Sequence, residues 1–209
     1  MLKEISCKIN TADEVLEAKV FNHDSLAGLV MCHPHPLFGG TMDNKVVTTV
    51  VRAARDLGIA TLRFNFRGVG ASSGEHDNGR AEQDDVLAAL HYAREELGWK
   101  RIILCGFSFG AGMACLAAGR APELVQSLIL IAPPVHHFAA PGQLPAGLPV
   151  RVCMGDADEV VPFDEVEEWV NKVKPAPEWH VFPGAGHFFH GRLTDLKGDL
   201  QALFSDFVR

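Results

Sequence analysis

The sequence predicts an α/β fold with a mostly parallel central sheet, helices on both faces and an antiparallel edge at the amino end. Short apolar runs typical of buried strands alternate with segments of helical period from residue 26 onward. The first twenty residues instead contain two strand-like runs joined by a polar turn. The 209 residues are 47% hydrophobic and 22% charged, which suits one well-buried core. We therefore expect a single domain over residues 1–209.

The predicted elements follow in chain order. A hairpin pairs Glu4–Ile9 with Val15–Phe21 through the polar turn Asn10–Asp13. After the polar residues Asn22–Ser25, a buried strand is expected at Leu26–Cys32. In the helix predicted at Arg80–Leu97, apolar residues fall on one face and acidic residues on the other. The remaining strands are expected at Ala60–Phe64, Arg101–Cys105, Ser127–Ile131, Val150–Met154 and Glu178–Phe182, and the helices at Asn44–Leu57, Arg80–Leu97, Phe109–Gly119, Phe163–Val173 and Leu193–Val208.

Charge and composition exclude several classes of function. The formal net charge of -7 argues against binding to nucleic acid or anionic membranes. No apolar stretch reaches the ~18 residues that a membrane helix needs, and the start M-L-K-E-I-S-C-K lacks the apolar core of a secretory signal. The five cysteines are scattered along the chain, which indicates free thiols in a reducing compartment and not disulfides. We expect a cytoplasmic protein.

The strongest local motif is G-F-S-F-G at Gly106–Gly110. It follows the apolar run R-I-I-L-C and leads into a helix-like segment of small residues. A serine at such a tight strand-to-helix turn projects from the sheet with its hydroxyl exposed. The strained backbone needs small neighbours, and glycine fits both flanking positions. Ser108 is therefore the candidate nucleophile.

A second stretch, Gly70–Gly74, matches the same pattern. Polar residues follow it instead of a helix, so we interpret Ser72 as a loop residue. The glycines of this region do not form a dinucleotide fingerprint, because their spacing is wrong and no helix follows at once. We expect no nucleotide cofactor. Nearby Arg67 can recognise a substrate carboxylate, but we expect neighbouring loop groups to satisfy its charge.

A serine hydroxyl needs an adjacent base, itself held by a third group, to attack at neutral pH. The glycine-rich loop Gly184–Phe189 follows the last predicted strand and offers His187, with His190 as an alternative. The segment G-D-A-D-E-V-V-P follows another strand and places carboxylates at its carboxyl end. Its neighbourhood leaves four acids open: Asp156, Asp158, Glu159 and Asp164.

The order Ser, Asp, His, with each member directly after a strand, resembles the α/β-hydrolase fold. The segments H-P-H-P-L-F-G-G-T-M-D-N-K and F-R-G-V-G-A-S-S-G-E further resemble small bacterial hydrolases related to dienelactone hydrolases and serine esterases. The likeness covers essentially the whole chain. It implies that Asp158 is the acid of a triad with Ser108 and His187.

The resemblance also implies an oxyanion hole of two backbone N–H groups. One donor would be Phe109, the residue after the nucleophile. The other would come from His33–Gly40, where two prolines cannot donate. This leaves His35 or Leu37, and we favour His35. The side chains of His33 and His35 are expected to shape the loop, and no metal is expected.

In this fold a lid usually lies between the strands that end near Ile131 and begin near Val150. Here the gap is only 18 residues long, Ala132–Pro149, so we expect no cap domain and an open site. Six apolar residues are candidate liners of that site, although each also fits the core: Phe38, Phe109, Val135, Phe138, Leu144 and Phe188.

Three functions remain open. The first is hydrolysis of a small carboxylic ester, for which all three triad candidates are present. The second is hydrolysis of an amide, peptide or lactone by the same residues, although enol-lactone hydrolases more typically carry cysteine in place of Ser108. The third is a non-catalytic binding protein on the hydrolase scaffold. A homodimer is a further expectation.

Overall fold

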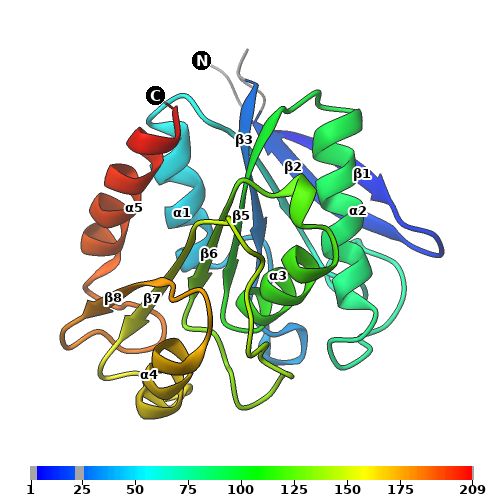
Figure 1. Ribbon diagram of the computed structural model, residues 1–209. Helices are drawn as coiled ribbons and strands as arrows, with labels where there is room; N and C mark the ends of the chain where they lie inside the picture. Colours follow the sequence, from blue (N-terminus) through cyan, green and yellow to red (C-terminus); the bar gives the residue numbers. More distant parts are fainter. Residues whose placement is uncertain (1–3, 22–25, 209) are drawn as a thin grey trace.

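Eight strands form one sheet, in the order β1-β2-β4-β3-β5-β6-β7-β8, in the computed structural model of residues 4–21 and 26–208 (Figure 1). The first three residues, which bear on a secretory signal, and the polar segment 22–25 lie outside the described residues. The strands are β1 (Ile5–Asn10), β2 (Val15–Phe21), β3 (Ala27–Cys32), β4 (Ala60–Phe64), β5 (Arg101–Phe107), β6 (Ser127–Ile131), β7 (Val150–Gly155) and β8 (Glu178–Phe182).

The amino-terminal hairpin forms the antiparallel edge that the sequence predicts. β1 pairs with β2 in a register that runs from Ile5↔Val20 to Asn10↔Val15, and β2 pairs antiparallel with β4. From β4 to β8, every neighbouring pair is parallel. Every residue of β3 is buried, because helices cover both faces of this central strand. The predicted fold class is confirmed.

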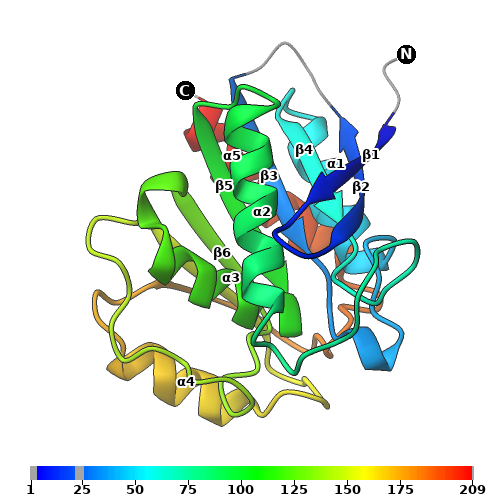
Figure 2. The same ribbon diagram turned by 90° about the vertical axis from the view of Figure 1, so that its right-hand side faces the viewer.

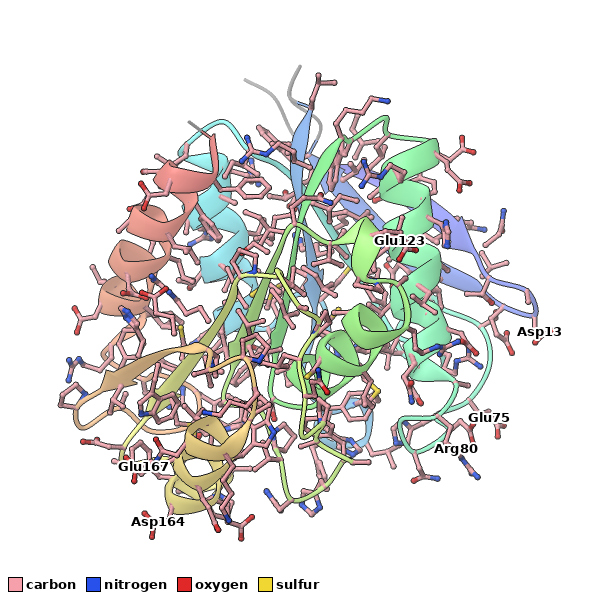
Figure 3. The ribbon with its side chains drawn as sticks, in the orientation of Figure 1. Asp13, Glu75, Arg80, Glu123, Asp164 and Glu167 are labelled. Carbon is pink, nitrogen blue, oxygen red and sulfur yellow. The ribbon has the colours of Figure 1, made fainter. Side chains whose placement is uncertain are left out.

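Helices lie on both faces of the sheet. α1 (Lys45–Arg55) and α5 (Leu193–Val208) pack together on one face, while α2 (Glu82–Glu95) and α3 (Phe109–Arg120) pack together on the other (Figures 1 and 2). α4 (Phe163–Lys172) contacts β7 and buries Val166 and Val170, whereas its acids Asp164 and Glu167 point to solvent (Figure 3). Within residues 4–21 and 26–208, no helix is both long and apolar enough to cross a membrane.

The acidic residues of α2 correct one expectation from the sequence. Two of them, Glu82 and Asp85, are 0% exposed instead of lying on a solvent face. Glu82 accepts backbone N–H groups from the loop before the helix. Asp85 binds Arg67, with Arg67 Nη2 2.6 Å from its Oδ1. Helical periodicity could not show this, because the partners of both acids come from the loop after β4.

The segment between β6 and β7, residues 132–149, is fully described and contains turns but no helix. One bridge, Gln143↔Lys174, fixes its far end beside the end of α4. No cap therefore covers the carboxyl ends of the central strands, as the length of this segment predicts.

Candidate active site

Parallel strands bring the predicted site residues to one edge of the sheet. Ser108 follows β5, Asp158 lies three residues after β7, and His187 lies in the loop after β8. The loop after β3, which contains His35, reaches the same edge, at the lower end of the view in Figure 1. Ligand sites of open α/β sheets form at this carboxyl edge.

The backbone of Ser108 has φ 54° and ψ -123°, a conformation that L-residues rarely adopt. The two flanking glycines make this turn possible. A Cβ on Gly106 would lie 2.2 Å from the carbonyl oxygen of Gly110, and a Cβ on Gly110 would lie 2.5 Å from that of Cys32. The motif therefore lets α3 begin directly against the ends of β3 and β5.

A continuous hydrogen-bond chain joins the three triad candidates. The hydroxyl Oγ of Ser108 lies 3.1 Å from Nε2 of His187, and Nδ1 of His187 lies 2.8 Å from Oδ2 of Asp158. Because the carboxylate accepts the Nδ1 proton, Nε2 presents a lone pair to the serine hydroxyl. The other carboxylate oxygen accepts backbone N–H groups at 2.9 and 2.7 Å, which fixes its orientation. All three groups are nearly buried, with Ser108 8% and His187 2% exposed.

The competing acids have other partners. Asp156 accepts the N–H of Gly184 at 2.6 Å, and Asp164 lies on the exposed side of α4. Glu159 accepts the backbone N–H of His187 at 3.0 Å. Sequence reasoning treated Glu159 only as a competing acid. No local pattern indicates that its side chain reaches a loop 28 residues further along the chain.

The alternative serine and histidine also lie elsewhere. Ser72 donates its hydroxyl to the carbonyl of Asn65 at 2.7 Å and accepts the N–H of Glu17 at 2.9 Å. These contacts hold the loop after β4 against β2. His190 is exposed and packs beside Phe188.

Two backbone N–H groups near Ser108 have no acceptor among the described residues, those of Phe109 and His35. Phe109 is the first residue of α3, where a helix N–H has no partner of its own. The N–H of Leu37 is already donated to Nδ1 of the His35 imidazole at 3.2 Å. The loop therefore favours His35 over Leu37 as the second oxyanion donor.

The buried side chain of His33 holds this loop in place through two hydrogen bonds. Its Nε2 accepts the N–H of Phe66 at 3.0 Å, and its Nδ1 donates to the carbonyl of Pro34 at 2.6 Å. Because Nε2 accepts, the imidazole must be neutral, with its proton on Nδ1. Burial lowers the pKa of His33 to about 4, so the ring stays neutral at physiological pH.

Two hollows flank Ser108. The first has a volume of about 350 Å³ and contains Phe38, Phe109 and four histidines in its wall: His35, His76, His136 and His137. The second has a volume of about 330 Å³, and its wall includes Phe38, Val160, His187 and Phe188.

Four of the six candidate liners lie in the walls of these two hollows or of an adjoining one. Phe38 and Phe109 line the first hollow, and Phe38 and Phe188 line the second. Phe138 lines an adjoining hollow that Phe109 shares.

Two of the candidates are corrected. Val135 faces α4 and shares a hollow with Trp169 instead of Ser108. Leu144 is 2% exposed and belongs to the core. Its backbone N–H donates to the carbonyl oxygen of Lys174, just after α4. The turns of the segment between β6 and β7 decide which way the side chains of Val135 and Leu144 point. Hydrophobicity alone does not reveal those directions.

Residues 35–149 match a family model described as the alpha/beta hydrolase fold, which is more than half of the chain. The chain belongs to the α/β-hydrolase family. The matched segment contains Ser108 but ends before β7, so Asp158 and His187 rest on the geometry given above. This α/β-hydrolase is 36% identical to an uncharacterised protein from Rickettsia prowazekii, over 86% of its own chain and 79% of the relative.

Solved structures resemble this α/β-hydrolase over nearly its whole length. An alpha-beta serine hydrolase homologue from Coxiella burnetii is 40% identical, with a TM-score of 0.88 over 97% of this chain and 98% of that one. A serine hydrolase without lid from Xanthomonas campestris is 36% identical, with a TM-score of 0.85 over 97% and 94% of the two chains. The family and these relatives support hydrolase activity in general.

Proposed function

We propose that the protein hydrolyses small carboxylic esters through an acyl-enzyme on Ser108. The observation that carries this proposal is the hydrogen-bond chain from Ser108 through His187 to Asp158, beside two N–H groups without acceptors. This arrangement holds a nucleophile, a base and an oxyanion site together.

The proposed reaction has two acyl-transfer steps. His187 takes the proton of Ser108 as the hydroxyl oxygen attacks the ester carbonyl, and Asp158 stabilises the imidazolium that results. The N–H groups of Phe109 and His35 hold the negative oxygen of the tetrahedral intermediate. His187 then gives its proton to the leaving alcohol, which leaves an acyl group on Ser108. In the second step His187 deprotonates a water molecule whose oxygen attacks the acyl carbonyl. The bond between the acyl carbon and Oγ of Ser108 then breaks, the acid is released, and His187 returns the proton to Oγ.

The conformation of Ser108 supports a functional role for this turn. A residue held in such a conformation costs about 1–3 kcal/mol of stability, and such strain is concentrated at active sites and ligand clamps. The open site without a cap suits small or flexible acyl groups better than long lipid chains. Amide, peptide or lactone substrates would use the same residues, and a substrate panel separates them from esters.

Labelling with a fluorophosphonate probe tests the proposal, because the probe reacts only with an activated serine. Wild type and Ser72→Ala should label, and Ser108→Ala should not. Folded wild-type protein that fails to label would overturn the proposal and favour the binding role. A panel of phenyl esters, anilides and lactones then ranks the classes of substrate.

We further propose a cytoplasmic location. All five cysteines are free, and burial raises the pKa of the four most buried thiols, which keeps them unreactive. Cell fractionation tests this location, and sedimentation tests the expected homodimer.

A further inference from the structure

The two hollows beside Ser108 differ in chemistry. We call the first the imidazole hollow, since His35, His76, His136 and His137 lie in its wall. We call the second the apolar hollow, since Phe188 lies in its wall and three of the four imidazoles do not. His35, Phe38 and Val160 line both hollows. A different chemistry on each side of the nucleophile indicates different groups on the two sides of the scissile bond.

The position of His187 assigns a direction to the substrate. In the proposed ester hydrolysis, on which this inference rests, His187 protonates the leaving alcohol and must lie beside it. His187 lines the apolar hollow but not the imidazole hollow. The alcohol therefore occupies the apolar hollow, and the acyl chain extends into the imidazole hollow past Phe109.

The imidazole hollow offers hydrogen-bond donors and no fixed negative charge. No Asp, Glu, Lys or Arg occurs among the described residues of its wall. The nearest cation along the chain, Arg80, has a 77% exposed side chain, pairs with Asp77 and points into solvent (Figure 3). Within this wall a charged acyl chain would meet the imidazoles and the amide of Asn78, while the carboxylate of Glu82 lies behind His76.

One of these imidazoles is held in place from behind. Nδ1 of His76 lies 2.7 Å from Oε1 of Glu82, without the alignment of a hydrogen bond. Glu82 is fully buried and is itself fixed by two backbone N–H groups. The side chain of His76 is only 7% exposed, and its Nδ1 has no aligned hydrogen-bond partner among the described residues. The contact with Glu82 therefore fixes the His76 ring in the wall of the hollow.

Burial and neighbouring imidazoles disfavour the protonated forms of His35 and His136. Burial, followed by the charges of His76 and His137, lowers the pKa of His35, although Glu82 opposes the shift. Burial, followed by His137, lowers the pKa of His136, which Glu165 opposes from α4. A negative group brought among these rings would favour their protonated forms and accept charge-assisted hydrogen bonds from them.

We propose that the imidazole hollow binds an acyl chain that ends in a carboxylate. The preferred substrates are then half-esters of short dicarboxylic acids with an apolar alcohol. The volume of about 350 Å³ is compatible with a short acyl chain. The wall of aromatic and aliphatic groups in the apolar hollow fits a phenyl or branched alkyl alcohol.

The test compares two phenyl esters with acyl chains of equal carbon number, monophenyl glutarate and phenyl pentanoate. We expect wild type to hydrolyse the glutarate half-ester with about tenfold higher kcat/KM, mainly through a lower KM, because the carboxylate contact is present before and during reaction. Reactions without enzyme correct for spontaneous cyclisation of the half-ester.

A double variant tests the histidines themselves. His136 and His137 are exposed, so His136→Gln with His137→Gln should fold normally. We expect it to reduce the preference for the half-ester about tenfold. The matched control is His91→Gln on the outer face of α2, which should leave the preference unchanged.

The outcomes separate this inference from the proposed function. Hydrolysis of both esters without a preference for the half-ester, or a preference that the double variant does not reduce, would overturn the carboxylate subsite alone. Failure to hydrolyse either ester, together with failure of Ser108 to label with a fluorophosphonate, would overturn both.

Discussion

The backbone N–H of His187 donates to Oε2 of Glu159 at 3.0 Å, while the imidazole of the same histidine contacts Asp158. Two consecutive acids therefore fix both the backbone and the ring of the proposed base. The contact is close enough that a Cβ on the adjacent Gly186 would lie 2.7 Å from the Glu159 carboxylate. Glu159 is in this sense a positioning residue.

We expect Glu159→Ala to lower kcat by about ten- to a hundredfold, because small displacements of a base are costly to the reaction rate. Glu159→Gln keeps an oxygen acceptor and should retain most of the activity. Steady-state kinetics on a phenyl ester and the rate of fluorophosphonate labelling measure both effects. Equal activity of Glu159→Ala and wild type would exclude a positioning role.

The two aspartates after β7 should differ sharply. Asp158→Asn leaves the space filled but presents the wrong hydrogen-bond partner to His187, so we expect kcat to fall by about 10⁴-fold. Asp156→Asn weakens one contact to Gly184 and should cost about 1 kcal/mol of stability with little loss of kcat. Kinetics and urea unfolding of the pair test this assignment. A larger catalytic loss in Asp156→Asn would reverse it.

His33 should make stability depend on pH. Its pKa is about 4 in the folded protein and 6.5 as a free side chain, so the unfolded chain binds more protons below pH 6.5. Its contribution to stability is complete above pH 6.5 and is lost as the pH falls toward 4. Between pH 7 and pH 5 the expected loss is about 2 kcal/mol.

Urea unfolding at the two pH values tests the contribution of His33. The variant His33→Gln removes the titrating group, so its stability should fall less than that of wild type over this interval. Equal losses in the two proteins would show that His33 is not the group responsible.

Alanine substitutions at two glycines of α3 should have opposite effects on stability. A Cβ on Gly110 would meet the carbonyl of Cys32, so Gly110→Ala should push the helix from β3 and cost about 1–3 kcal/mol or more. Gly119 has nothing within 4 Å of the added atom, and Gly119→Ala should add about 0.5–1 kcal/mol through helix propensity. Thermal and urea unfolding compare them. A stable Gly110→Ala would contradict the close approach of α3 and β3.

The strands were largely predictable from the sequence because most of the parallel strands are buried and therefore continuous apolar runs. Four strands begin and end at the predicted residues: Val15–Phe21, Ala60–Phe64, Ser127–Ile131 and Glu178–Phe182. Helix ends were less accurate. The helix predicted at Arg80–Leu97 begins at Glu82 and ends at Glu95, since its first turn depends on contacts with the preceding loop.

Within the site, Ser108 and His187 could be predicted because each lies in a glycine-containing turn or loop directly after a predicted strand. The choice between Asp156 and Asp158 depended on the family resemblance, because two acids in one turn look alike until their partners are known. Glu159, Glu82 and the fourfold histidine wall could not be predicted. Their partners are separated from them in the chain or converge from several loops.

The proposed nucleophile and its base are 79 residues apart, and the β8 strand must pair with β7 before the loop of His187 reaches the serine. During synthesis the elbow around Ser108 emerges well before that loop. A growing chain would therefore carry a serine without a base and could not be labelled or acylated. Onset of fluorophosphonate reactivity on the ribosome would mark the moment at which the last strand of the sheet joins the rest.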